Sequence, residues 1–147
     1  MRYQWILINL CDWKTTSRLR VIILSQQDTA LVNALQRTAA VVLQKSLREG
    51  FGLTVTEAMW KGAAVIGGNV GGIRYQIQNG VTGFLVSSVG EAAERIVRLI
   101  KDKKLRLRLG QRAKETVKKR FLLTRYMEQY LDLFNSSEVL YRFKRKP

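Results

Sequence analysis

The sequence contains no histidine, a single cysteine and a single proline, and only 11 acidic residues against 26 lysines and arginines. Without histidine, the chain offers neither a serine–histidine or cysteine–histidine nucleophile system nor a zinc site that needs imidazole. One cysteine, Cys11, allows no intrachain disulfide, which is typical of a reducing compartment. No apolar run approaches the roughly 18 residues that a membrane span requires. We therefore expect a cytoplasmic protein without a membrane span.

What the chain does contain is enough apolar sequence for one folded domain. Its residues are 46% hydrophobic, which is too apolar for a disordered chain. A length of 147 residues is too short for two full domains. Residues 95–147 carry 17 basic and 5 acidic side chains. This charge indicates either a nucleic-acid-binding surface or the solvated outer face of amphipathic helices. We favour the second interpretation, because neither aromatic interleaving nor a nucleic-acid-binding motif accompanies the charge.

Short, continuous, β-branched apolar runs predict buried strands. These strands are expected at 21–24, 41–43, 63–67 and 83–86. Segment 28–37 predicts a helix with Leu31, Ala34 and Leu35 on its apolar face, and segment 54–62 predicts a second helix ended by Gly62. Strands that alternate with helices indicate a parallel sheet with crossover connections. We therefore predict an α/β fold with a partial doubly wound, Rossmann-like sheet.

The last third of the chain has helical periodicity throughout. The pair Asn79-Gly80 predicts a tight turn before the last strand, and helices are expected from Glu91 onward. Their apolar faces comprise Ala92, Ala93, Ile96, Leu99 and Ile100, then Leu105, Leu109, Ala113 and Val117, then Met127, Tyr130, Leu131 and Phe134. The expected organisation is a poorly assigned segment 1–18, either strand or helix, an α/β domain at 19–134 and a basic tail at 135–147.

Two glutamates, Glu49 and Glu57, flank the apolar, glycine-containing segment between the strand at 41–43 and the next helix. In open α/β sheets, ligands bind beyond the carboxyl ends of the strands, and a helix N-terminus favours phosphate. Gly50 and Gly52 let the backbone approach a ligand closely. These features suit a nucleotide diphosphate.

Each glutamate also has a structural interpretation. Residues Thr54 to Glu57 have the pattern of a capping box, in which Thr54 caps the helix and Glu57 returns a hydrogen bond. Glu49 can be a solvated loop residue at the end of a buried strand. From the residues alone, ligand binding and structural support stay open as alternatives.

The stretch REGFGLTVTEAMWKGAAVIGGNVGGIRYQIQNGVTGFLV, residues 48–86, resembles the donor-binding core of retaining, GT-B-fold glycosyltransferases that use nucleotide-activated sugars. The resemblance rests on the E-x7-E spacing of Glu49 and Glu57, the following GG pair and NGVTGFLV, and it covers residues 19–134. REGFGLTVTEAMWKG and VGGIRYQI are most similar to the trehalose-synthase branch, which joins nucleotide-diphospho-glucose to free glucose. The resemblance implies the C-terminal domain of a GT-B fold, with UDP- or ADP-glucose as substrate and neither a cofactor nor a metal ion.

The resemblance also implies roles for individual residues. Glu49, the catalytic residue, would bind donor-sugar hydroxyls close to the reacting carbon, and Glu57 would accept hydrogen bonds from the ribose. The donor-binding segment next to Glu49 comprises Gly50, Phe51, Gly52, Leu53 and Thr54, whose backbone would bind the sugar and diphosphate. Arg48 would add positive charge near the diphosphate, although a surface arginine is the simpler interpretation. Gly71 and Gly72 would shape the neighbouring loop.

The chain departs from the family pattern at Ala40, where an aspartate is usual, and at Ala64, where a proline is usual. The resemblance also reaches only the later part of the second GT-B domain, without the acceptor-binding domain or the arginine–lysine pair that neutralises the diphosphate. Stabilising that charge is usually the largest catalytic term. We therefore expect a donor-binding part that is inactive alone. The alternatives are a partner-dependent subunit, completed by a second chain or a homo-oligomer, and, less favoured, a basic nucleic-acid-binding protein.

Overall fold

Residues 6–8 and 28–136, the part of the chain that this computed structural model describes, contain one sheet with the strand order β1-β2-β3-β4. The strands are β1 (Ile6–Ile8), β2 (Val41–Gln44), β3 (Ala64–Gly68) and β4 (Phe84–Val86). β2, β3 and β4 are parallel, whereas β1 pairs with β2 in the antiparallel direction. The strands predicted at 41–43, 63–67 and 83–86 are confirmed. The strand predicted at 21–24 lies outside the described residues.

Helices alternate with the strands and then continue alone, as predicted. They are α1 (Thr29–Thr38), α2 (Leu53–Trp60), α3 (Ile73–Gln76), α4 (Val89–Lys101), α5 (Lys103–Arg120) and α6 (Leu123–Asn135). α2 ends just before Gly62, and a turn at 80–82 follows Asn79 and leads into β4. The predicted α/β fold with a partial parallel sheet is therefore confirmed. Of the segment 1–18, only the strand β1 belongs to the described residues, and 137–147 of the predicted tail lie outside them.

The parallel strands send alternate side chains to two apolar clusters, one on each face of the sheet. Val42 and Val65 enter the cluster with α2 and α3, which includes Val55, Met59, Ile73 and Ile77. Val41, Ala64 and Ile66 enter the cluster with α4, which includes Phe84, Ala92 and Leu99. Because both faces are covered, the strands have continuous apolar sequences rather than alternating ones.

Helix α5 joins the two clusters, because one stripe of side chains runs along its whole length. Leu105 and Leu109 pack in the cluster of α4, while Ala113 and Val117 pack in the cluster of α2. α5 passes close to the end of α2, where a Cβ on Gly110 would lie 2.0 Å from the Gly62 carbonyl oxygen. This approach requires glycine at position 110. The predicted apolar face of α5 is confirmed.

The predicted apolar face of α1 is wrong. Leu31 is 46% exposed, Ala34 is exposed and Leu35 is half-buried, while Gln36 is 1% exposed. The physical reason is that α1 turns Gln36 toward Glu57 on α2 and Lys61 just after it, so that polar contacts and not apolar packing orient this helix. In α4, Ala92 and Leu99 are buried as predicted, but Ala93 is exposed because it lies on the outer edge of the stripe.

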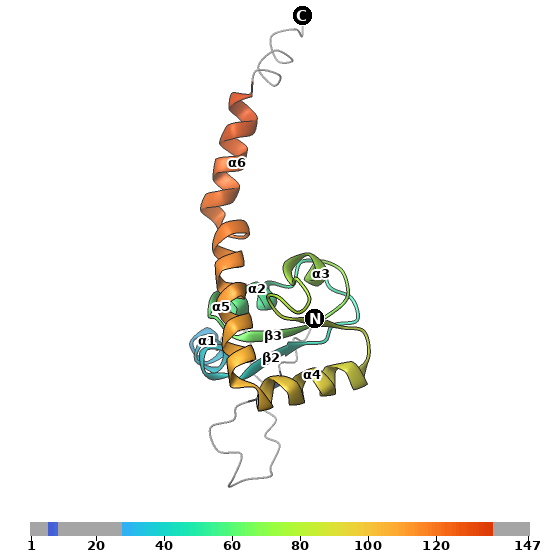
Figure 1. The fold of residues 1–147 in the computed structure, drawn as a ribbon. Helices are drawn as coiled ribbons and strands as arrows, with labels where there is room; N and C mark the ends of the chain where they lie inside the picture. Colours follow the sequence, from blue (N-terminus) through green and yellow to red (C-terminus); the bar gives the residue numbers. More distant parts are fainter. Residues whose placement is uncertain (1–5, 9–27, 137–147) are drawn as a thin grey trace, which may run out of the picture.

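Helix α6 has the predicted helical spacing but buries none of its side chains within the described part of the chain. Met127, Tyr130, Leu131 and Phe134 are between 42% and 58% exposed. The helix projects away from the sheet and its covering helices (Figure 1). Its apolar stripe therefore has no partner among the described residues.

Candidate functional site

The loop that joins β2 to α2 lies at the carboxyl end of β2, where ligands bind in open α/β sheets. It ends at Gly52, whose φ of +81° lies in the left-handed region that favours glycine. A Cβ on Gly52 would lie 3.0 Å from Cγ1 of Ile73 and 3.4 Å from Cγ of Glu49. The turn into α2 therefore depends on glycine both for its backbone angle and for space.

The Gly71-Gly72 turn after β3 supports this loop through backbone contacts. Gly72 N donates hydrogen bonds to the carbonyl oxygens of Gly50, at 2.7 Å, and Glu49, at 3.4 Å. A Cβ on Gly71 would lie 1.7 Å from the Glu49 carbonyl oxygen, so no larger residue fits there without moving the loop. The expected role of Gly71 and Gly72 in shaping the loop agrees with this geometry.

Glu49 is half-buried, and its carboxylate is held by side chains from the end of β2. Its Oε2 accepts hydrogen bonds from Ser46 Oγ at 3.3 Å and from Gln44 Nε2 at 3.4 Å. Gln44 Nε2 also donates to Ser46 Oγ at 2.9 Å. The position of this carboxylate is therefore set by a small polar network, which does not fit a solvated loop residue.

The predicted capping box is wrong. α2 begins at Leu53 with Gly52 as its N-cap, so Thr54 lies inside the first turn, and no described side chain caps the helix. Thr54 is buried instead of capping. Glu57 is exposed, and its Oε2 accepts a hydrogen bond from Gln36 Nε2 at 3.4 Å. Glu57 thus lacks the structural role that competed with ligand binding.

A cation lies close to Glu57. Lys61, the residue after α2, donates from Nζ to Gln36 Oε1. Burial lowers the pKa of Lys61, nearby Glu57 acts in the opposite direction, and Arg37 adds a smaller lowering effect. Gln36 therefore lies between an ammonium group and a carboxylate, within hydrogen-bond reach of both.

Phe51 links the loop to two more distant elements. Its carbonyl oxygen accepts a hydrogen bond from Gln76 Nε2, and its ring meets that of Phe121 edge-on, with centroids 6.0 Å apart. Gln76 is 1% exposed, and its Oε1 is the buried side-chain polar atom that lacks a hydrogen-bond partner among residues 28–136. That oxygen lies beside Gly52, 3.7 Å from where its Cβ would be.

The other predicted site residues lie at the open side of the same loop. Arg48, Gly50 and Leu53 are exposed, and a Cβ on Gly50 would have no atom within 4 Å. The structure thus brings the segment from Arg48 to Glu57 together around one turn, with the two carboxylates at its ends.

The sequence analysis missed three buried glutamines that contact this segment. Gln36 reaches Glu57, Gln44 reaches Glu49 and Gln76 reaches the Phe51 carbonyl. Gln44 directly follows the apolar run 41–43, and Gln36 follows Ala34 and Leu35, so at these two positions a polar residue breaks the expected pattern; Gln76 follows no such run. Because a buried amide needs hydrogen-bond partners, a glutamine that breaks an apolar pattern was the sequence signal that could have indicated these contacts.

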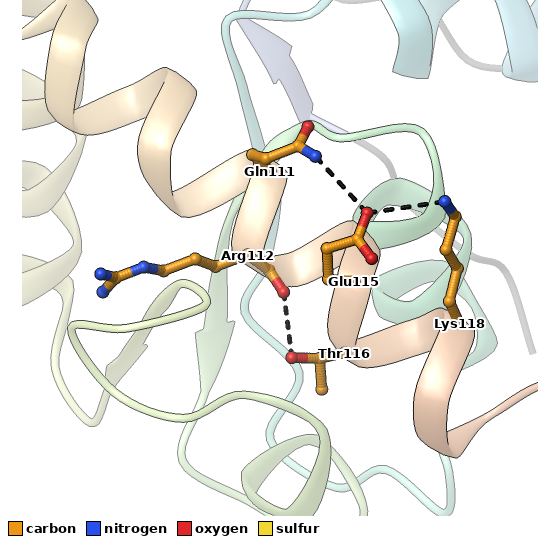
Figure 2. Close-up of polar contacts among 5 residues, drawn as sticks. All are labelled: Gln111, Arg112, Glu115, Thr116 and Lys118. Carbon is orange, nitrogen blue, oxygen red and sulfur yellow. Dashed lines mark hydrogen bonds and ion pairs between the residues drawn. The ribbon is translucent and has the colours of Figure 1, made fainter.

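Helix α5 carries half of the basic side chains of residues 28–136, and local contacts account for part of its outer face. Figure 2 shows Glu115 between Lys118, at 3.5 Å, and Gln111, at 3.4 Å, while Thr116 Oγ1 donates to the Arg112 carbonyl. Among residues 6–8 and 28–136, no group of three or more cysteine, aspartate or glutamate side chains is arranged to hold a metal ion. None of the described helices is both long and apolar enough to cross a bilayer.

Several known proteins are similar to this chain in sequence or in fold. The sequence profile of the family described as glycosyl transferases group 1 matches residues 12–116. The trehalose synthase of Pyrococcus horikoshii is 56% identical over 105 residues, which cover 71% of this chain and 25% of that protein. The trehalose synthase of Rubrobacter xylanophilus is 46% identical over 103 residues, with 70% and 24% covered. The solved structure of Anabaena Alr3699/HepE in complex with UDP-glucose superposes with a TM-score of 0.65 and 26% identity, covering 71% of this chain and 30% of that one.

The chain therefore spans about a quarter of the length of these two trehalose synthases. The resemblance noted from the E-x7-E spacing and the glycine pair is confirmed, both by the family profile and by the similarity to trehalose synthases. Because the profile covers well over half of the 147 residues, the chain belongs to the glycosyl transferases group 1 family.

Proposed function

We propose that this chain binds the nucleotide-diphospho-glucose donor of a glucosyl transfer like that of the trehalose synthases. The observation that carries the proposal is the pair of carboxylates, Glu49 and Glu57, each hydrogen-bonded to a buried glutamine at the two ends of one glycine-containing turn. In this proposal, residues 19–134 form the donor-binding part and 135–147 a basic tail.

Each end of the turn has its own partner in the donor. Glu49 binds hydroxyls of the glucose near the reacting carbon, and Glu57 accepts hydrogen bonds from the ribose. The backbone amides of Phe51 to Thr54 bind the sugar and diphosphate, because the start of α2 carries unpaired N–H groups and a positive partial charge. Arg48 is exposed beside Glu49 and adds positive charge near the diphosphate.

We propose that the isolated chain binds the donor without transferring its sugar. Developing charge on the leaving diphosphate must be neutralised for transfer to proceed. The matched relatives are about four times as long as the part they share with this chain, so the acceptor site and further cations are expected from sequence outside the match.

A partner-dependent subunit is the second candidate, and α6 favours it. Leu123, Met127 and Phe134 on this helix are more than half exposed, and an apolar stripe of this kind commonly marks an interaction surface. Nucleic-acid binding through α5 is less favoured, because Glu115 and Gln111 interrupt its basic outer face (Figure 2).

The experiment is a titration of isotope-labelled protein with UDP-glucose and ADP-glucose, followed through backbone amide shifts by NMR. We expect saturable shifts centred on Gly50 to Glu57 for at least one donor. Glu57→Gln should weaken binding about 10-fold, since a charged hydrogen-bond acceptor becomes neutral. Gln111→Ala on the outer face of α5 is the control and should bind like the wild type.

A folded sample that shows no shifts in this segment with either donor would refute the proposal. Shifts confined to α5 would favour nonspecific electrostatic binding instead. That binding would weaken strongly as salt is added.

A further inference from the structure

Helix α1 buries an amide in place of an apolar side chain. Its ten residues are all described, and the side chain that they bury is Gln36, which is 1% exposed. Burying an amide costs free energy unless its donor and its acceptor both find partners. The identity of those partners therefore indicates what the burial achieves.

Gln36 joins two groups of opposite charge. Lys61 Nζ donates to Gln36 Oε1, and Gln36 Nε2 donates to Glu57 Oε2 at 3.4 Å. An ammonium group can only donate and an ionised carboxylate can only accept, so the amide has a single favourable orientation. Among the described residues Lys61 and Glu57 form no direct ion pair, and Gln36 is the connection between them.

The contact with Gln36 leaves most of the Glu57 carboxylate available. Glu57 is exposed, and an ionised carboxylate has about four acceptor positions, of which Gln36 occupies one. The side chain is therefore held through one oxygen and open at the other. The two hydroxyls of a ribose have a fixed mutual geometry, so an oriented carboxylate accepts them better than a freely rotating one.

We infer that Gln36 is a positioning residue for ribose recognition and that Lys61 fixes its amide. The inference rests on the proposed donor-binding function, in which Glu57 accepts the ribose hydroxyls. Gln36 makes no contact with the ligand. It restricts Glu57 to one orientation before the nucleotide arrives, which lowers the ordering cost of binding.

The test is the affinity ratio between a nucleoside diphosphate and its 2′-deoxy form, measured by calorimetry on the full chain. UDP and ADP are both titrated, and the one that binds more tightly is used with its 2′-deoxy counterpart. Gln36→Met should lower the affinity for the ribose nucleotide about 3- to 10-fold and the affinity for the deoxy nucleotide by less, so that the ratio of the two affinities approaches one. Lys61→Met should shift the ratio in the same direction by a smaller factor, whereas Lys61→Arg, which keeps a donor, should retain the wild-type ratio.

Gln44→Met is the matched control, because it removes the same kind of amide from Glu49 instead of Glu57. Its ribose-to-deoxy ratio should equal that of the wild type. Circular dichroism establishes that each variant is folded. If Gln36→Met does not fold, Lys61→Met carries the test, because Lys61 is only partly buried.

The outcomes separate this inference from the proposed function. A folded Gln36→Met that keeps the wild-type ratio would overturn the inference and leave donor binding intact. An equal loss for the ribose and deoxy forms would overturn it as well, because that loss indicates general damage to the site. Wild-type protein that binds neither UDP nor ADP would overturn both.

Discussion

The ring of Phe51, in the loop before α2, packs edge-on against the ring of Phe121, the first residue after α5, at an interplanar angle of 68°. Phe121 is partly buried against the cluster of α2, while Phe51 is 46% exposed. The end of α5 therefore supports the loop that carries Glu49, although the two segments are far apart in the sequence. Local order at the candidate site thus depends on a contact from the C-terminal helices.

Replacing Phe121 with alanine should destabilise the protein and loosen this loop. The variant loses the aromatic contact with Phe51 and part of the packing at the end of α5. We expect the free energy of unfolding to fall by about 1–3 kcal/mol. Urea denaturation measures the loss.

Phe134→Ala on α6 is the matched control, because Phe134 is 58% exposed. We expect it to change the free energy of unfolding by less than about 0.5 kcal/mol. Equal losses in the two variants would contradict the supporting role of Phe121.

The sheet and most helices could be predicted from the sequence because burial dictates their pattern. Val41 and Val42 face opposite sides of the sheet and are both 0% exposed, so a continuous apolar run is what this strand requires. The stripe from Leu105 to Val117 was equally clear, since its spacing matches one helical face.

The polar contacts could not be predicted in the same way, because they depend on tertiary geometry. The S/T-x-x-E pattern at Thr54 does not form a capping box, whereas the same pattern at Ser88 and Glu91 caps α4, with Ser88 Oγ accepting from Glu91 N at 3.1 Å. The two stretches differ in the preceding turn: Gly52, in the left-handed region, already occupies the N-cap of α2. Pairing Gln36 with Glu57 likewise required knowing how α1 lies against α2.

Gly71→Ala should disrupt the site, because Gly71 lies directly against the loop that carries Glu49. The added Cβ would lie 1.7 Å from the Glu49 carbonyl oxygen, and φ is +46°, where a Cβ is strained even in open space. We expect a loss of at least about 2 kcal/mol in the free energy of unfolding, together with displacement of the Glu49 loop. Denaturation and the amide shifts of Glu49 to Gly52 measure the two effects.

Gly50→Ala is the control for this substitution, since its Cβ would have no atom within 4 Å and its φ is not positive. It should change the free energy of unfolding by less than about 1 kcal/mol. If Gly71→Ala were as stable as Gly50→Ala, the backbone contact between the two loops would not be a constraint.

Truncation after Leu122, which removes α6, should leave the remaining fold intact. α6 buries no side chain within the described part of the chain, so its loss removes little packing. We expect the midpoint of thermal unfolding to change by less than about 3 °C. A fall of more than about 8 °C, measured by calorimetry, would show that α6 contributes to the core.

The pH dependence of stability should reveal the partly buried ammonium of Lys61. Burial lowers the pKa of Lys61 from its usual 10.5, so the native state binds this proton less tightly than the unfolded chain does. The cost of the buried charge is present in full below the lowered native pKa and is relieved as the pH rises from there toward 10.5. The stability of the wild type relative to Lys61→Met should therefore increase across that window. Urea denaturation of both proteins at several pH values measures the difference, and the comparison cancels effects common to the +15 chain.

Glu57→Gln sharpens this test, because Glu57 acts to raise the pKa of Lys61. Without the carboxylate, burial acts with less opposition and the native pKa falls further. The increase in relative stability should then begin at a lower pH and become larger, when Glu57→Gln is compared with the double variant Glu57→Gln, Lys61→Met. If the relative stability stays flat with pH, both for wild type against Lys61→Met and for Glu57→Gln against the double variant, Lys61 binds its proton equally well in the folded and unfolded states. Gln36 would then be hydrogen-bonded to a solvated lysine and not to a partly buried one.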